Sequence, residues 1–363
     1  MGKLAKYQIV YEEILTRISN GEYKTGEKIP PESQLMEFFS VSRHTIRQAI
    51  SALVNDGVLE KVQGSGTFVL ELERKQRSHA KNKTIGVITT YLSDYIFPSI
   101  IRGIEEELRS NGYSLLLAST QNNPEHERES LEMMMQHEVE GLIVEPTQSS
   151  YLTPNLPYYL DLKLNHIPFV YLHSSYPEMD APMVGMDDVA ATEEATEHLL
   201  KLGHRQIAIV TKVDDVQGRN RLKGFMNAFE KAQLPLSADA VITYETISHD
   251  RLHEDIAKTL TSQNRPTAFV AYNDQTALLI EEVAQAVNLR VPEDLSLVSH
   301  DASGIRLEAS GKMLTSILHP QEQMGKDAAN LLLQLVKNSQ TKAESIIYKP
   351  SLIIKDSTKS PLI

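Results

Sequence analysis

The chain has 363 residues, no cysteine, a formal net charge of −12 and a mean hydropathy of −0.27. The lack of cysteine excludes disulfide bonds and thiolate metal sites, and no apolar run reaches the roughly 18 residues of a membrane span. The first residues carry acidic side chains where an export signal would need an apolar core, so we expect a soluble, cytoplasmic protein of two or three domains.

The first 70 residues contain a closely spaced set of short predicted elements. Glu32–Phe39 carries apolar side chains at helical spacing, and Ser42 is a suitable N-cap for a second helix over Arg43–Asn55. Apolar residues repeat along that second helix at intervals of four and three, which leaves its first turns polar. Two predicted strands, Val58–Val62 and Thr67–Leu70, then flank a glycine-containing turn. This order predicts a winged helix-turn-helix domain.

The polar start of the second helix indicates contact with DNA. Arg43, His44 and Arg47 can face outward together, and the first turns of a recognition helix are those that reach base edges. An arginine there can bond guanine O6 and N7 with roughly 1–3 kcal/mol of discrimination. The charge balance supports this only in part, because residues 1–70 hold eight basic and eight acidic side chains. We therefore expect binding to depend on a clustered face and on dimerisation.

The ordered motifs PxExxL, SRxTxRxAxxxLxxxG and GxGTFV resemble the DNA-binding domain of the GntR family of bacterial regulators, over about Tyr7 to Val69. The resemblance implies double-stranded operator DNA as a partner. It places the following residues at the DNA: Glu32, Arg43, Thr45, Arg47, Gln63 and Gly64. It implies phosphate or backbone contacts at a second set, with Lys6 as a further candidate: Ser42, His44, Gly66 and Thr67.

Residues 71–83 are polar, charged and aperiodic, and we interpret them as a linker between a domain at 1–70 and the rest of the chain. Beyond them, apolar runs alternate with amphipathic segments. The predicted strands are Thr84–Thr89, Ser114–Ala118, Leu142–Val144, Phe169–Leu172, Ile207–Val210, Val241–Tyr244, Ala268–Ala271, Leu295–Ser299 and Leu314–Ile317. The predicted helices include Pro98–Ser110, Glu125–His137, Arg219–Gln233, Asp250–Ser262, Gln275–Val287 and Glu322–Val336.

This alternation predicts an α/β domain of parallel sheets covered by helices on both faces. We place the domain at residues 84–356, with a short tail at 357–363. Another helix is expected after Asp187 or Asp188, with Gly203 at its end. The long connections around 144–170 and 301–314 are expected to be loops or crossovers, and no internal repeat is visible.

Ligands of open parallel sheets bind beyond the carboxyl ends of the strands. Polar, aromatic and acidic residues stand at those positions: Tyr95, Phe97, Glu145, His173, Asn273 and Asp301. Carboxylates and amides bond hydroxyl groups, and aromatic rings cover the apolar face of a sugar. Taken singly, each residue also has a structural interpretation, such as a helix cap or loop surface. Together they indicate a small, uncharged ligand with many hydroxyl groups.

The segments DDVAATEEATEHLLKLGHRQIAIV, RNRLKGFMNAF, PTAFVAYNDQTALLI and LTSILHPQEQMG resemble the effector domain of the LacI/GalR family, over about Lys83 to Asp356. The resemblance implies two similar periplasmic-binding-protein-like α/β lobes, a hinge of crossing strands and a cleft between them. It further implies that Arg221, Asn273 and Asp301 meet the effector. His173 stands where the family often has an acidic residue that contacts the ligand.

A GntR-type head on a LacI-type effector domain resembles a group of bacterial repressors of sugar utilisation, and this resemblance implies L-arabinose as the effector. We therefore expect a homodimeric repressor that sugar releases from DNA, with no cofactor, metal or catalytic residue. Two alternatives stay open. A solute-binding protein would lack the DNA-binding head, and an enzyme acting on sugars would need paired carboxylates such as Glu145 and Asp301. No G-x-S-x-G, HExxH or P-loop motif supports an enzyme.

Overall fold

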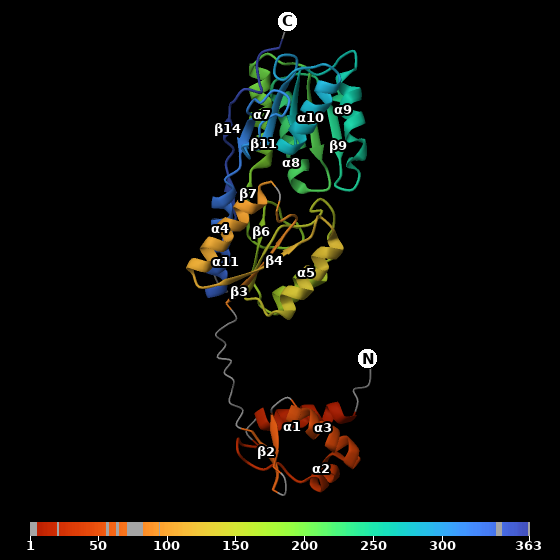
Figure 1. Cartoon of the computed structure of the whole chain (residues 1–363), viewed down its shortest axis with the longest axis vertical. Coiled ribbons are helices and arrows are strands. Elements are labelled where there is room, and N and C mark those ends of the chain that lie inside the picture. Colours follow the sequence, from red (N-terminus) through yellow and green to blue (C-terminus); the bar gives the residue numbers. More distant parts are fainter. Residues whose placement is uncertain are drawn as a thin grey trace. The chain divides into compact units, whose positions relative to one another are not determined.

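The computed structural model describes residues 6–19, 22–55, 58–62, 65–70, 83–93, 95–338 and 343–361. The chain divides into two compact units, Met1–Lys81 and Asn82–Ile363 (Figure 1). The predicted linker lies outside the described residues except for Lys83, and so do Gln63 and Gly64 of the predicted turn.

The described part of the first unit is a helical domain with a two-stranded hairpin. Its elements are α1 (Lys6–Ser19), α2 (Glu32–Phe39), α3 (Arg43–Asn55), β1 (Leu59–Val62) and β2 (Gly66–Val69). The apolar faces of α1 and α3 meet in one core, where Ile14, Ile46 and Leu53 are fully buried. The strands are antiparallel, and residues 26–29 bond the outer side of β2. The predicted winged helix-turn-helix is confirmed, with strand ends shifted by one residue.

The second unit consists of two lobes, each built on a six-stranded sheet. Lobe 1 contains β3 (Thr84–Thr89), α4 (Phe97–Ser110), β4 (Ser114–Ser119), α5 (Pro124–Gln136), β5 (Gly141–Val144), α6 (Leu156–Leu164), β6 (Phe169–Leu172), β7 (Met183–Met186), α11 (Gln321–Lys337) and β13 (Ile346–Tyr348). Lobe 2 contains α7 (Asp188–Lys201), β8 (Ile207–Lys212), α8 (Val216–Lys231), η1 (Ala238–Ala240), β9 (Val241–Tyr244), η2 (His249–Arg251), α9 (Leu252–Leu260), β10 (Ala268–Ala271), α10 (Asp274–Ala286), β11 (Ser296–Asp301), β12 (Thr315–Leu318) and β14 (Leu352–Ile353).

The two sheets repeat one strand order. It is β13-β7-β6-β5-β3-β4 in lobe 1 and β14-β12-β11-β10-β8-β9 in lobe 2. The pairs are parallel except for β12 and β14, which are antiparallel. The repeat that the sequence does not reveal is therefore present in the fold. The predicted α/β class and two-lobed architecture are confirmed.

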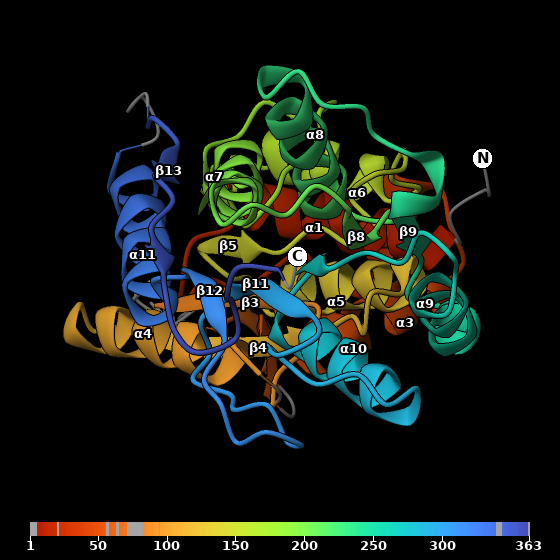
Figure 2. The same ribbon diagram turned by 90° about the horizontal axis from the view of Figure 1, so that it is seen from above.

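Helices cover both faces of each sheet, as parallel sheets require. In lobe 1, α4 and α11 bury their apolar sides on one face, while α5 and α6 cover the other. In lobe 2, α9 and α10 cover one face and α7 and α8 the other. Figure 2 shows α4 beside α11 and α7 beside α8. Met134 of α5 is fully buried in the core on its side of the lobe 1 sheet.

Three connections join the lobes in the described residues: β7 to α7, β12 to α11, and β13 to β14. The strands that precede or follow them are β13 and β7 at one edge of the first sheet, and β14 and β12 at the corresponding edge of the second. We call this side the hinge edge. The opposite edges are formed by β4 and β9. The hinge of crossing strands implied by the family resemblance is thus present on one side only.

Several elements were not predicted, among them α1 and η1. The 144–170 connection contains α6, and the edge strands β7, β13 and β14 are two to four residues long. Short edge strands carry little periodic signal, because only a few side chains alternate. Residues 357–361, predicted as a tail, pack on lobe 2. The backbone nitrogen of Leu297 donates to the carbonyl of Ser357 (2.8 Å), and that of Lys359 donates to the hydroxyl of Ser296 (3.0 Å).

Candidate DNA-contacting face and ligand cleft

The start of α3 presents a polar face. The hydroxyl of Ser42 caps the helix by accepting from the backbone nitrogen of Thr45 (3.3 Å), as predicted, and lies 2.9 Å from the hydroxyl of Thr45. Arg43, His44 and Arg47 are exposed on the first turns, while Ile46 is fully buried. The helix therefore packs one face inward and leaves these cationic and polar groups free to meet a ligand.

An ion pair joins two of the predicted DNA-contacting residues. Nε of Arg47 lies 3.2 and 3.1 Å from the two carboxylate oxygens of Glu32, the first residue of α2. The arginine side chain is 62 % exposed, so the pair contributes little stability, about 0–1 kcal/mol. A phosphate or guanine acceptor could therefore replace Glu32 as the partner of Arg47 with little loss of free energy.

The hairpin carries the other predicted DNA-contacting positions. Gly66 begins β2 with a φ of +136°, a conformation that favours glycine, and the carbonyl of Thr67 accepts from the backbone nitrogen of Ile29 (3.0 Å). Gln63 and Gly64 lie outside the described residues. Lys6 is the first residue of α1, and the structure describes its backbone but not its side chain. Lys61, which pairs with Thr67 in the hairpin, is exposed and adds a basic side chain beside the predicted positions.

A cavity of about 480 Å³ lies between the two lobes of the second unit. Residues after the carboxyl ends of strands from both sheets line it, as expected for parallel sheets. All seven residues predicted to bind the effector lie around this one cavity: Tyr95, Phe97, Glu145, His173, Arg221, Asn273 and Asp301. The sequence positions are up to about two hundred residues apart, so the fold brings them together.

In lobe 1, Glu145 and His173 form a buried pair. Nδ1 of His173 lies 2.7 Å from Oε1 of Glu145, while Oε2 accepts from the backbone nitrogen (2.7 Å) and the hydroxyl (2.5 Å) of Thr90. Burial alone would raise the pKa of Glu145, but His173 and Thr90 lower it below its ordinary value. Since an ionised carboxylate only accepts, Nδ1 carries a proton. Nε2 of His173 has no hydrogen-bond partner among the described residues.

In lobe 2, Arg221 lies at the centre of a buried network. Its Nε donates to Asp188 (2.9 Å), one terminal nitrogen donates to the carbonyl of Tyr272, and the other lies 3.7 Å from Asp301. Its guanidinium also stacks on the ring of Tyr272, 4.8 Å from the centroid. Asp188 opens α7, directly after one connection between the lobes. The network thus joins the hinge edge to the cavity.

The carboxyl group of Asp301 is fully buried beside this arginine. Burial raises the pKa of Asp301 to about 6, with Arg221 opposing the rise and Asp274 adding to it. Asp274 itself is a structural residue, because its carboxylate accepts from the hydroxyl groups of Ser299 and Ser316 and from the backbone and hydroxyl of Ser303. These bonds hold the loop that follows β11 and thereby position Asp301.

The remaining predicted residues have distinct local roles. Asn273 caps α10 through Oδ1, which accepts from the backbone nitrogen (2.8 Å) and the hydroxyl (2.9 Å) of Thr276. The hydroxyl of Tyr95 reaches from lobe 1 to the backbone nitrogen of Asp274 in lobe 2 (3.0 Å). Phe97, expected in a loop, is the first residue of α4. Tyr95, His173 and Asp301 all have positive φ angles, and strained backbone of this kind clusters at functional sites.

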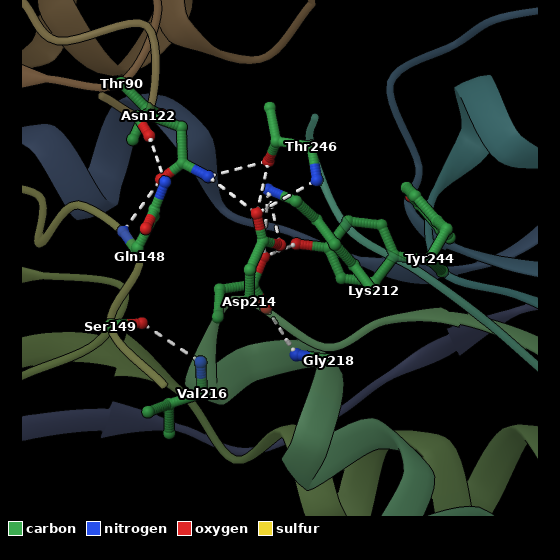
Figure 3. Close-up of polar contacts among 12 residues, drawn as sticks. Thr90, Asn122, Gln148, Ser149, Lys212, Asp214, Val216, Gly218, Tyr244 and Thr246 are labelled. Atoms are coloured by element: carbon green, nitrogen blue, oxygen red, sulfur yellow. Dashed lines mark hydrogen bonds and ion pairs between the residues drawn. The ribbon is translucent and has the colours of Figure 1, made fainter. Parts of the chain in front are cut away.

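Direct contacts join the lobes on the side away from the hinge edge (Figure 3). The amide nitrogen of Asn122, after β4, donates to Asp214 (3.1 Å) and Thr246 (2.7 Å), which follow β8 and β9. A second contact joins the backbone nitrogen of Val216 to the hydroxyl of Ser149 (3.0 Å). Figure 3 shows Asn122 and Ser149 on one side and the lobe 2 residues facing them. Side chains of the two lobes therefore bond each other directly on this side of the second unit.

Several lining residues were not named from the sequence. They include Lys212, the last residue of β8, Asp215, between β8 and α8, and Tyr272, directly after β10. The hydroxyl of Tyr272 donates to Asp215 (2.7 Å), and Lys212 lies between Asp214 and Asp215. Their position after predicted strands was the available signal. It did not single them out, because a strand end in a sequence does not reveal which side chain turns toward the cleft.

Comparison with known proteins agrees with both units. Residues 6–69 match the family of bacterial regulatory proteins of the gntR type, and residues 196–358 match the periplasmic binding protein-like domain. The chain is 44% identical over 360 residues to an arabinose metabolism transcriptional repressor of Geobacillus stearothermophilus, with 98% of each chain covered. The chain belongs to the family of arabinose metabolism transcriptional repressors.

A second member of this repressor family, from Halalkalibacterium halodurans, is 41% identical over 362 residues, which cover 97% of this chain and 96% of the relative. Among solved structures, a LacI family transcriptional regulator from Enterococcus faecium with bound ribose matches with a TM-score of 0.65 and 26% identity. It covers 76% of this chain and 99% of its own.

The family assignment decides between the functions considered for the sequence. The chain is a sugar-responsive transcriptional repressor and not an enzyme. In the part of the chain that the structure describes, no helix is long and apolar enough to span a membrane. No cluster of three or more potential metal ligands occurs among those residues either.

Proposed function

We propose that this repressor binds operator DNA as a homodimer, through α3 and the hairpin of each first unit, and that L-arabinose bound in the cleft releases it. The cleft observation carries the proposal, because seven residues predicted as sugar contacts surround one cavity of about 480 Å³. The names of the two arabinose metabolism repressors reported above support arabinose as the effector. A partner in operator DNA also supports a cytoplasmic location.

The cavity suits a neutral sugar. Acceptors and donors stand in both lobes, among them the Glu145–His173 pair on one side and Arg221 and Asp301 on the other. Aromatic side chains, including Phe97 and Tyr244, supply the apolar surface that a pyranose face needs. The opposite charges near the cavity offset each other, so no strongly charged ligand is favoured.

Coupling to DNA follows from the position of the hinge edge. A sugar that bonds both lobes favours one angle between them, and that angle is transmitted through lobe 1 to the DNA-binding units of the dimer. By thermodynamic linkage, operator DNA must then weaken sugar binding by the same factor by which sugar weakens DNA binding.

Titration calorimetry of L-arabinose, with and without saturating operator duplex, tests the proposal. We expect saturable heat with the free protein and a weaker sugar affinity in the presence of the operator. Equal affinities in both titrations would show that L-arabinose is not an inducer. D-Xylose and D-galactose serve as comparison ligands, and light scattering of the free and DNA-bound protein tests the homodimer.

A further inference from the structure

Lys212 is a buried cation at the wall of the cleft. It is the last residue of β8, so its side chain leaves the carboxyl end of the sheet of lobe 2, and it lines the cavity. Only 13 % of the side chain is exposed. Burying an ammonium group is costly unless its three donors find acceptors. The contacts of this ammonium therefore show whether the protein itself satisfies it.

The acceptors within the protein satisfy Lys212 only loosely. Nζ lies 3.3 Å from Oδ2 of Asp215 and 3.5 Å from Oδ1 of Asp214 (Figure 3), whereas a strong ammonium–carboxylate hydrogen bond is about 2.7–2.9 Å. Oδ2 of Asp215 already accepts from the hydroxyl of Tyr272 (2.7 Å). The charge of Lys212 is thus compensated, but its donors have no close acceptor among the described residues.

The charge state of Lys212 is well defined. Burial alone would lower the pKa of Lys212, but Asp215 and Asp214 raise it above its ordinary value. The side chain is therefore an ammonium donor at neutral pH. Arg221, the other buried cation at the cavity, differs in that it donates to Asp188 and to the carbonyl of Tyr272 at hydrogen-bonding distance.

We propose that Lys212 is an effector-binding residue, whose ammonium donates to one oxygen of the sugar and so selects ligands that carry an acceptor at that position. This inference rests on the proposed function of the cleft as a sugar site. The same ammonium lies beside Asp214, whose carboxylate accepts from Asn122 of the opposite lobe (3.1 Å). A sugar bound to Lys212 would therefore contact a side chain that itself lies beside the bond between the two lobes.

The test is a calorimetric comparison of L-arabinose and its monodeoxy analogues on the wild-type protein and on Lys212→Met. Methionine keeps the length and apolar stem of the side chain and removes the donors. We expect Lys212→Met to bind L-arabinose roughly tenfold to a hundredfold more weakly, the range for a hydrogen bond to a charged group. Lys223→Met, an exposed lysine of α8, is the matched control and should bind as the wild type does.

The analogues distinguish a direct contact from a structural role. If Lys212 donates to one sugar oxygen, the wild type loses affinity for the analogue lacking that oxygen, and Lys212→Met shows no further loss for it. Lys212→Gln retains a donor and should therefore still show part of the affinity loss for the analogue that lacks this oxygen. This variant replaces Lys212→Met in the test if the methionine variant does not fold.

Two outcomes would overturn the inference in different ways. Identical penalties for every analogue in the wild type, Lys212→Met and Lys212→Gln would mean that Lys212 only neutralises the two aspartates. A wild-type protein that binds no L-arabinose would overturn the proposed function of the cleft, and the contact with it.

Discussion

The imidazole of His173 is fixed by Glu145, with Nδ1 of the histidine 2.7 Å from Oε1 of the carboxylate. The second oxygen, Oε2, accepts two bonds from Thr90, so neither oxygen of Glu145 is free of a donor. Glu145 therefore acts as a positioning residue for His173, whose Nε2 has no hydrogen-bond partner among the described residues. Sequence reasoning had assigned both residues alike as effector contacts.

Glu145→Gln is predicted to weaken sugar binding by reversing the proton position on His173. The backbone nitrogen of Thr90 requires an oxygen opposite it, which turns the amide nitrogen toward Nδ1 and forces that atom to accept. Nε2 then carries the proton and becomes a donor. We expect roughly a tenfold or larger loss of L-arabinose affinity in calorimetry, from a lost hydrogen bond of about 1.5 kcal/mol.

Glu129→Gln is the matched control for this variant, because Glu129 is exposed on α5. Nitrogen-15 spectra of the imidazole report the tautomer directly. An unchanged tautomer in Glu145→Gln would contradict the explanation even if affinity fell.

Asp301 is predicted to make stability depend on pH. Its pKa is raised from 3.8 to about 6 in the folded protein, so the folded state binds this proton more tightly than the unfolded chain. The contribution of Asp301 to the unfolding free energy is fully present below 3.8, its pKa in the unfolded chain. It is lost as the pH rises through about 6. The cost at neutral pH is at most about 3 kcal/mol.

Asp301→Asn removes this pH-dependent cost. The unfolding free energy of the variant, relative to that of the wild type, should rise between pH 4 and pH 8 by up to about 3 kcal/mol. Chemical denaturation at several pH values measures the difference. Parallel pH profiles for the two proteins would show that Asp301 titrates normally.

Arg221→Ala and Asp301→Ala are predicted to give a repressor that sugar cannot release. Both remove groups at the cavity wall, while the DNA-binding unit is a separate body. Loss of Arg221 also leaves Asp188 buried without its partner, which costs about 3–5 kcal/mol, so Asp301→Ala is the cleaner variant. Operator release is followed by fluorescence anisotropy as L-arabinose is added. Release at the wild-type sugar concentration would refute the assignment of the cleft.

Arg43→Ala is predicted to abolish specific operator binding and leave sugar binding intact. Arg43 is exposed in the first turn of α3, where a base contact contributes roughly 1–3 kcal/mol in each half-site. Anisotropy with specific and scrambled duplexes should show the loss only for the specific duplex. Arg109→Ala, at an exposed arginine of α4, makes the same change of charge in the second unit and should bind DNA normally.

Gly325→Ala is predicted to destabilise the protein, although alanine favours helices by about 1 kcal/mol over glycine. A Cβ at Gly325 in α11 would collide with the backbone carbonyl of Ile100 in α4. Separating these helices should cost about 1–3 kcal/mol, measured by thermal unfolding. Increased stability would mean that the two helices can move apart freely.

Much of this architecture could be predicted from local pattern. Helices α2 and α3 and the cap at Ser42 in the first unit follow from apolar spacing and capping chemistry, and the alternation after residue 84 predicts the parallel sheets. The strand ends also indicated which loops carry the cleft residues, and the structure brings those residues together around one cavity.

What the sequence could not show depends on distance and side-chain direction. That Glu145 serves His173 depends on a bond from Thr90, more than fifty residues earlier. Lys212 was not singled out, because its position shortly after the predicted strand Ile207–Val210 does not reveal that its side chain is buried at the cleft. The contact of Asn122 with Asp214 joins residues about ninety positions apart and has no local pattern.

All three described connections between the lobes lie on the hinge edge, so the two lobes of the second unit can rotate relative to each other about that edge. A rotation of the lobes about the hinge edge displaces the opposite side most, even when it is too small to disturb the buried Arg221 network. On that opposite side, Asn122 bonds Asp214 and Thr246. Substitutions at the hinge edge should then alter the angle through which the two lobes rotate. Substitutions on the opposite side should alter how often the two lobes separate. The amplitude and the frequency of the motion can therefore change independently during evolution.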